Sequence, residues 1–316
     1  MHILTNKKWY FVLVLVLAMA TAPVWGPQYV VFFCLLFCIY LALAQSWNLL
    51  IGYSGLFSLA QAIFIGLTGY TMAVLTSYFG RDLWLSLLAG GLISVLFALF
   101  MSLFIFRVSG IYFGIITLLF SDALMLLFSN WAYIRYSQGM FIKPPHPVTI
   151  NTIYYAAFIV GVGSVVLVYA ILRSGLGLGL MAMRDDEQVA NATGVAVFKC
   201  KLYCFLIAAF ISGLAGGIYY TFQIFIQPYE AFSLSWSVKM IFMVIIGGIA
   251  TIEGPILGAF IFVLLSQWLA EYFSVSMLVL GVIAISVMII APKGIMGMLQ
   301  EKWGLQILSP RRKMTE

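Results

Sequence analysis

From Trp9 to Gly80 the chain reads WYFVLVLVLAMATAPVWGPQYVVFFCLLFCIYLALAQSWNLLIGYSGLFSLAQAIFIGLTGYTMAVLTSYFG, without one Asp, Glu, Lys, Arg or His. A helix that crosses the hydrocarbon core of a bilayer needs about 20 predominantly apolar residues. The uncharged stretch is long enough for several such helices. It predicts a protein whose surroundings are mostly lipid.

The rest of the chain has the same character. Hydrophobic residues make up 64% of its 316 residues and charged residues only 8%, with a mean hydropathy of +1.11. Soluble domains are about 25% charged. The composition therefore excludes an ordinary soluble protein. The net charge of +6 is explained by membrane topology and anionic membrane lipid, and it requires no nucleic acid.

The apolar runs favour helices over barrel strands. Backbone groups inside a bilayer must find partners within the protein, so only helices and closed barrels span it. The runs lack the in-and-out alternation of barrel strands. We therefore expect an all-α, polytopic protein, a single transmembrane domain over residues 1–316 with about ten transmembrane helices. The predicted spans are 9–25, 28–50, 56–79, 83–106, 111–129, 152–172, 202–222, 236–252, 255–272 and 275–291.

Lys and Arg predict the orientation, because they are retained on the cytoplasmic side. An even number of spans places both termini in the cytoplasm, with 292–316 as a basic tail. The residues that then lie inside are Lys7, Lys8, Arg107, Arg173, Arg184, Lys199, Lys201, Lys293, Lys302, Arg311, Arg312 and Lys313; those outside are Arg81, Arg135, Lys143 and Lys239. The first span resembles a signal peptide, but we interpret it as an uncleaved helix.

A polar segment interrupts the membrane sequence between Arg173 and Lys201, around the run Arg184, Asp185, Asp186, Glu187. We predict a water-exposed cytoplasmic loop. Within it, Leu180–Thr193 is expected to form one short helix, with Leu and Met for packing and the charged residues hydrated. Composition alone favours an ordinary solvated loop over a docking surface for a cytosolic partner.

Asp122 lies in the middle of the fifth predicted span. A carboxylate at that depth costs about 2.5–3.5 kcal/mol on insertion scales, and such groups usually face the bundle interior. Two interpretations are open. Asp122 either lines a path and hydrogen-bonds a polar solute, or it makes a fixed hydrogen bond to a neighbouring helix.

Glycines mark two breaks in the membrane sequence. Gly52 and Gly55 follow the second span, and the run from Gly247 to Pro255 surrounds Glu253 with helix-weakening residues. Irregular backbone at membrane depth is tolerated only where protein or a watery cavity covers it. We predict a tight inner-side turn or a broken helix beside a path, with Glu253 at a helix boundary where water screens it. Packing alone is the alternative explanation of the glycines.

The cysteines and other reactive groups do not form a recognisable site. Cys34 and Cys38, like Cys200 and Cys204, are spaced i, i+4. No His or second Cys pair completes a ligand set, so packed thiols are favoured over a metal centre. No intramembrane His, paired carboxylates or Ser with a base can be named, which disfavours an intramembrane enzyme.

Several stretches, in chain order from about residue 40 to 265, resemble the LivM-type permease subunits of branched-chain amino acid ABC importers. They are Asn48–Gly55 with Ser58, Leu59, Ala60, Phe64, Gly66, Gly69 and Tyr70; Gly110–Phe113 with Thr117 and Leu118; Gly175, Gly179, Met181, Arg184, Asp185, Glu187, Ala190 and Gly194; Ser212–Gly216 with Tyr219; and Gly247, Gly248, Thr251, Gly254, Pro255, Leu257, Gly258 and Ala259.

The resemblance implies the architecture of an ABC importer permease. Residues 173–201 would be its cytoplasmic coupling loop, with Met181, Arg184, Asp185, Glu187, Ala190 and Gly194 as ATPase-coupling residues. The candidate path residues are Asp122, Thr117, Gly52, Gly55, Gly247, Gly248 and Glu253. The implied partners are two cytosolic ABC ATPases, a sister permease in a heterodimer, and a periplasmic or extracellular binding protein, at the inner membrane of a bacterium.

The chain contains no Gly-x-x-x-x-Gly-Lys-Ser/Thr sequence, so we expect it to lack ATPase activity and to bind no cofactor, with ATP and Mg on the partner subunits. It departs from the family pattern at Ala250, where Gly is more usual, at Glu253, where an aromatic residue is frequent, and at Ile134–Met140, where a Thr-Gly-Gly stretch is frequent. Urea or short amides are therefore alternative cargoes. An ion-coupled secondary transporter that uses Asp122 or Glu253 is the rival class.

Overall fold

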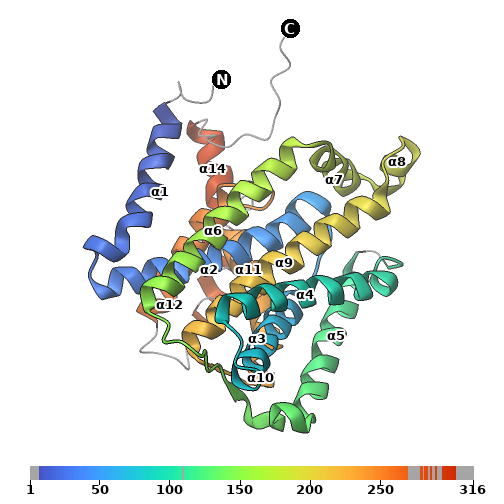
Figure 1. Ribbon diagram of the computed structural model, residues 1–316. Coiled ribbons are helices and arrows are strands. Elements are labelled where there is room, and N and C mark those ends of the chain that lie inside the picture. Colours follow the sequence, from blue (N-terminus) through green and yellow to red (C-terminus); the bar gives the residue numbers. More distant parts are fainter. Residues whose placement is uncertain are drawn as a thin grey trace.

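The computed structural model describes residues 7–108, 110–269, 278–279, 281–283, 285–286, 289 and 294–303, and this part of the chain is almost entirely helical (Figure 1). The first half contains α1 (Lys7–Trp25), α2 (Gln28–Asn48), the π-helical segment η1 (Leu49–Tyr53), α3 (Gln61–Ser77), α4 (Leu83–Ile105), α5 (Ile111–Ser129), two 3₁₀ turns (Ala132–Ile134 and Tyr136–Gln138), β1 (Met140–Phe141) and α6 (Ile150–Arg173). The second half contains α7 (Gly175–Asp185), α8 (Glu187–Ala192), α9 (Val197–Gln223), β2 (Phe225–Ile226), α10 (Pro228–Ala231), α11 (Ser235–Gly247), α12 (Gly254–Trp268) and α14 (Gly294–Trp303).

Each predicted span up to residue 272 overlaps one of these helices, although several of the bounds differ. The last predicted span, 275–291, lies largely outside the described residues. In the described part, six segments are long and apolar enough to cross a membrane: Gln28–Tyr53, Leu83–Ile105, Ile111–Ser129, Ile150–Arg173, Val197–Gln223 and Pro228–Gly247. The second half of α1, α3 and α12 are apolar but shorter.

The outward faces of the helices are apolar, as lipid requires. Along α4, the exposed residues include Leu88, Leu92, Leu96, Leu99 and Leu103, which recur at the spacing of one helix face. A soluble protein rarely exposes so continuous an apolar surface. The chain is an all-α, polytopic membrane protein.

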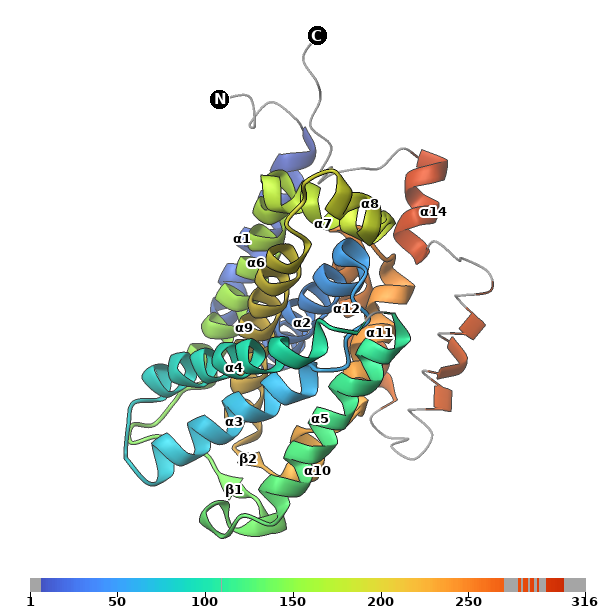
Figure 2. The same cartoon turned by 90° about the vertical axis from the view of Figure 1, so that its right-hand side faces the viewer.

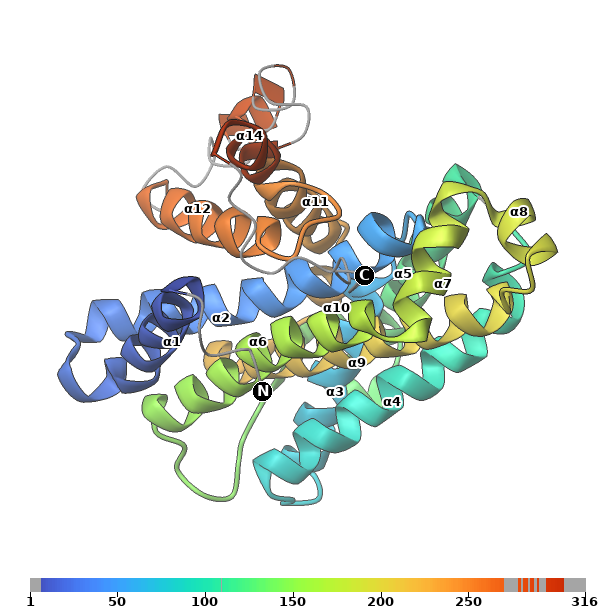
Figure 3. The same cartoon turned by 90° about the horizontal axis from the view of Figure 1, so that it is seen from above.

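Helix α2 lies at the centre of the bundle, with α6 and α9 on one side and α11 and α12 on the other (Figure 3). From Ile39 to Leu50 every residue is buried, including the polar side chains of Gln45, Ser46 and Asn48. Because α2 touches both groups of helices, these polar groups are placed to connect them.

The third predicted span begins at residue 56, whereas α3 begins at Gln61. Partners outside helical register satisfy the intervening backbone: Trp47 Nε1 donates to the Ser58 carbonyl at 2.9 Å, and Leu59 N donates to Thr117 Oγ1 at 3.0 Å. The apolar composition of 56–60 is compatible with a helix, so composition predicts the early start while tertiary contacts decide against it.

The two ends of the bundle differ. The elements α7 and α8 lie at the same end as the start of α1, whereas β1, β2 and α10 lie at the opposite end (Figure 2). β1 pairs with β2 in antiparallel register, with Met140 opposite Ile226. The predicted polar loop and the irregular segment 130–149 therefore lie at opposite ends, as the predicted spans require.

Helices α11 and α12 meet in an unusually close crossing. A Cβ atom on Gly258 would overlap the carbonyl of Met243, and one on Gly247 would overlap the carbonyl of Gly254. Absence of a side chain lets the two backbones approach, as is common in membrane bundles. The glycines of this late run thus have a packing role, whatever else they do.

Candidate functional site

The polar segment after α6 folds into two helices, α7 and α8, which meet at Asp186; we call Gly175–Ala192 the elbow. The prediction of one helix over Leu180–Thr193 is wrong. Asp186 leaves the helical region (φ −158°, ψ 115°), and its carboxylate accepts hydrogen bonds from the backbone N–H groups of Gln188 at 2.8 Å and Val189 at 3.0 Å. Asp is a favoured N-cap because it pairs these otherwise unsatisfied groups, so it ends α7 and starts α8.

The elbow is amphipathic in the way the sequence predicted. Leu180, Met183 and Ala190 are buried, and Met181 is half-buried. The charged residues Arg184, Asp185, Asp186 and Glu187 are exposed, as is Gly194 (φ +90°) just beyond α8. The buried side anchors the elbow to the bundle and leaves Arg184–Glu187 as an exposed charged ridge.

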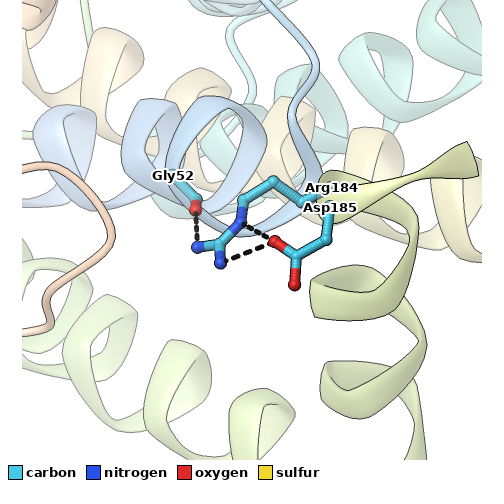
Figure 4. A network of polar contacts seen from close by, with 3 residues as sticks. All are labelled: Gly52, Arg184 and Asp185. Carbon is cyan, nitrogen blue, oxygen red and sulfur yellow. Dashed lines mark hydrogen bonds and ion pairs between the residues drawn. The ribbon is translucent and has the colours of Figure 1, made fainter.

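Arg184 also binds back to the bundle, which the sequence did not predict. Its Nη1 donates to the carbonyl of Gly52 at 3.0 Å, while Nε at 3.1 Å and Nη2 at 3.0 Å both donate to Oδ1 of Asp185 (Figure 4). Gly52 lies in η1, the continuation of α2, where the last carbonyls have no donor in a following turn. A cation is favourable at that end of a helix. Gly55 (φ +72°) packs against the same arginine.

Asn48, one turn before Gly52, binds the turn between α11 and α12. Its Nδ2 donates to the carbonyl of Thr251 at 2.8 Å, and its Oδ1 accepts from the backbone N–H of Ala250 at 3.0 Å. Gly52 itself is in contact with Ala250: a Cβ on Gly52 would meet the backbone N of Ala250 at 2.8 Å and would overlap Oδ1 of Asn48. Two of the predicted glycine breaks, distant in sequence, therefore lie side by side.

The turn at Gly248–Glu253 is the predicted tight connection between spans. Gly248 (φ 124°) and Ala250 (φ +60°) have positive φ, and Thr251 Oγ1 bridges the turn, donating to the Gly248 carbonyl at 2.8 Å and accepting from Gly254 N at 3.0 Å. Glu253 stands at the start of α12 as predicted, but the expectation that water screens it is wrong, because it is only 8% exposed. Glu253 is therefore a buried residue at the N-cap of α12.

A second ion pair holds α8 to α9. Lys201 Nζ lies 2.6 Å from Oε1 of Glu187, and the lysine side chain is only 5% exposed against 47% for the glutamate. Beside this pair is a cavity of about 680 Å³, a size common among small-molecule sites. It is lined by Phe106, Arg107, Val108, Glu187, Gln188, Asn191, Val197, Phe198 and Lys201. The cavity opens between α8 and the ends of α4 and α9, next to the charged ridge.

Asp122 and Thr117 lie away from this cluster, on opposite sides of α5. Thr117 is fully buried and bonded to Leu59 and Gly114. Asp122 is exposed, on a stripe that also contains Leu119 and Leu126. Among the described residues no hydrogen bond of the Asp122 side chain is found, so the fixed interhelical bond considered above is not formed within this part of the chain.

In the described residues no three His, Cys, Asp or Glu side chains gather as metal ligands would. The four cysteines are free thiols, with Cys38 and Cys204 buried. Sequence reasoning did not single out Asn48 and Lys201 as candidate site residues, although both make side-chain contacts there. Their signal was available in part: Asn48 is a polar residue inside an uncharged run, where a buried amide needs partners.

Comparisons with known proteins show which family the chain belongs to. Residues 29–291 match the family described as "Branched-chain amino acid transport system / permease component". The chain is 27% identical to the high-affinity branched-chain amino acid transport system permease protein LivM of Escherichia coli, over 93% of this chain and 76% of that one. It is 27% identical to LivM of Salmonella typhimurium, over 82% of this chain and 68% of that one. No solved structure matches. The family match covers most of the chain, from the centre of the bundle to its last predicted span, and the chain belongs to the permease components of branched-chain amino acid transport systems.

Proposed function

We propose that this chain is the transmembrane permease subunit of an ATP-driven importer of branched-chain or related amino acids. It forms half of the translocation path and couples to a cytosolic ATPase. The observation that carries the proposal is the elbow: a charged, exposed ridge of Arg184–Glu187 on a segment that is anchored in the bundle by buried residues and by the Arg184–Gly52 hydrogen bond. An ordinary solvated loop needs neither the anchor nor the second helix.

The ATPase partner would dock on the elbow. Asp185 projects from the ridge with 71% of its side chain exposed, and the cavity beside Glu187 and Gln188 offers a recess for a side chain of the partner. Two ATPase subunits would hold the ATP and Mg. Closure of the ATPase pair would move the elbow, and the bundle would alternate between inward-facing and outward-facing states.

The other half of the path would come from a sister permease. Asp122 lies on an exposed, otherwise apolar stripe of α5, and a carboxylate is unfavourable against lipid. A sister subunit that covers this stripe would remove Asp122 from lipid and place it at the shared path. A binding protein on the opposite face would deliver the solute to the end of the bundle that carries β1 and β2.

In this proposal the elbow is cytoplasmic, both termini are cytoplasmic, and the protein resides in the inner membrane of a bacterium. The predicted excess of Lys and Arg on that side supports the orientation. Arg107, Arg184 and Lys201 all lie at the elbow end of the bundle, near the cavity or the ridge.

Coexpression with candidate ATPases tests the proposal. The chain is purified with and without them, reconstituted, and assayed for ATP-dependent uptake of labelled leucine, with isoleucine, valine and urea as competitors. A variant in which Arg184, Asp185, Asp186 and Glu187 are all Ala should lose ATPase copurification and uptake. A control with Arg81→Ala and Lys143→Ala, exposed residues at the predicted outer side, should keep both. Uptake by the chain alone, unchanged by the four substitutions, would instead identify a self-sufficient secondary transporter.

A further inference from the structure

We propose that the π-helical end of α2, Leu49–Tyr53, transmits movement of the elbow to the turn between α11 and α12, with Arg184 and Asn48 as its positioning residues. This inference rests on the proposed function, because it concerns how the docked ATPase reaches the membrane helices. It assigns a role to two hydrogen-bonded contacts, one at Gly52 within this segment and one at Asn48 directly before it.

The first contact is the arginine. Three of its nitrogen donors are used at once, two by Asp185 and one by Gly52. Asp185 is the most exposed end of this arrangement. Any partner that draws Asp185 outward pulls on the guanidinium that also binds the Gly52 carbonyl. The contact between Arg184 and the membrane helix therefore depends on the position of the ridge.

The segment that receives this pull is not a regular helix. In a π-helical turn the backbone bonds run from i to i+5, and such turns are rare and frequent at functional sites. Here the carbonyls are shared with outside donors: Leu50 O accepts from Ser54 Oγ at 2.6 Å and from Leu56 N at 3.0 Å, and Leu49 O accepts from Cys204 Sγ at 3.6 Å. In the proposed movement, a register change between π and α would exchange these bonds rather than lose them.

The second contact, made by Asn48, joins the end of α2 to the turn between α11 and α12. Asn48 bonds Ala250 and Thr251 through both ends of its amide, and a Cβ on Gly52 would lie only 2.8 Å from the backbone N of Ala250. The Tyr53 side chain, at the end of the same segment, is buried. A shift of Leu49–Tyr53 must displace the Gly248–Glu253 turn, and with it the start of α12.

A purely structural role is the competing explanation, because Arg184 caps the end of a helix and Asn48 satisfies buried groups. The two explanations predict different effects on transport for variants that lose the same amount of stability. Ser46 supplies the matched control: it is equally buried on α2, but it bonds Ser212 of α9 at 2.8 Å and not the α11–α12 turn. Loss of that bond weakens the fold without touching the proposed route.

The experiment uses the complete transporter in proteoliposomes and measures leucine moved per ATP hydrolysed. Arg184→Gln and Asn48→Leu should each lower this ratio by about tenfold, the equivalent of one charge-assisted or buried hydrogen bond, while ATPase subunits still copurify. Arg184→Lys should restore part of the ratio, and Asp185→Asn, which leaves the Gly52 bond possible, should lower it less than Arg184→Gln. Ser46→Ala should lower the melting temperature but not the ratio.

The double variant Arg184→Gln with Asn48→Leu should be no worse than either single variant, because both interrupt one route. Additive losses, or a ratio that falls equally with Ser46→Ala, would overturn the inference while the importer assignment stands. Loss of ATPase copurification in the wild-type chain would overturn the proposed function itself. The two failures are therefore distinguishable in one set of preparations.

Discussion

At the scale of single residues, the site depends on polar groups placed where a bilayer protein offers few partners. Asn48 is fully buried, yet its amide uses both a donor and an acceptor on the backbone of one distant turn. Arg184 satisfies a helix-end carbonyl that no following turn supplies with a donor. These contacts fix the positions of backbone segments, which is the property that the proposed coupling between the elbow and the membrane helices requires.

Gly52→Ala should destabilise the protein, because the added methyl would overlap Oδ1 of Asn48 and press on Ala250. The expected loss is about 1–3 kcal/mol in the free energy of unfolding, the usual range for overpacking. Thermal denaturation in detergent measures it. Gly163→Ala is the control, since nothing lies within 4 Å of the position that its methyl would take; equal destabilisation by both variants would contradict the proposed crowding at Gly52.

At the scale of elements, most spans could be predicted and the elbow only in part. Long apolar runs predict helices because lipid forces the backbone to bond within each segment, so α5 and α6 begin and end close to their predicted bounds. The break at Asp186 was missed because Leu180–Thr193 favours helix on composition, and only the cap bonds to Gln188 and Val189 reveal the change of direction.

The contacts of the candidate site were less predictable for a different reason. Asn48 and Thr251 are 203 residues apart, and Arg184 and Gly52 are 132 residues apart. A single sequence, considered by itself, contains no signal for such pairs. The sequence did single out Gly52, Arg184 and the Gly247–Pro255 run separately, because each breaks the apolar pattern; it could not show that they meet.

The Glu187–Lys201 pair gives a prediction for the attachment of α8 to α9. Glu187→Gln leaves Lys201 buried without its counter-charge, so it should cost about 1–3 kcal/mol of stability. Adding Lys201→Met should recover part of that loss, because it removes the buried charge that Glu187→Gln leaves without a partner. Chemical denaturation of the two variants tests this. A double variant less stable than Glu187→Gln would show that the lysine contributes mainly through other contacts.

At the scale of the whole molecule, the subunit places its charged ridge and its outer strand pair at opposite ends, with α2 and α9 running between them (Figure 2). The exposed apolar faces of α4 and α5 require lipid or another subunit as cover. Asp122 is the one charged residue described on the α5 stripe. Its carboxylate is costly against lipid and less costly against another subunit, so the two kinds of cover differ most at this position.

Asp122→Leu should reduce leucine uptake by the complete transporter by about tenfold or more, corresponding to about 1.4 kcal/mol per tenfold, with little change in melting temperature. A hydrogen-bonding role at the path predicts that Asp122→Asn retains more uptake than the leucine variant. Equal loss in both would indicate that the charge itself is needed, as in an ion site. An Asp122→Leu protein that folds poorly yet transports normally per folded molecule would refute the path role.

Thiol labelling tests the orientation. In a background with Cys34, Cys38, Cys200 and Cys204 replaced, Gln188→Cys should react with an impermeant maleimide only in inside-out vesicles. Lys143→Cys, in the segment at the opposite end, should react only in right-side-out vesicles. Labelling of Gln188→Cys from outside would invert the topology and exclude a cytosolic motor acting on α8.

Helix α9 has a mechanical consequence. Its 27 residues form a rod of about 40 Å; Lys201 near one tip is clasped by Glu187, and the chain just past the other tip pairs with β1 through Ile226. A rigid helix that is held at both ends can transmit a displacement in either direction. In the proposed transporter, binding events on the two faces of the membrane should then be coupled reciprocally. A binding protein near β1 and β2 would change the affinity of the ATPase for α8 by the same factor by which the ATPase changes the affinity for the binding protein.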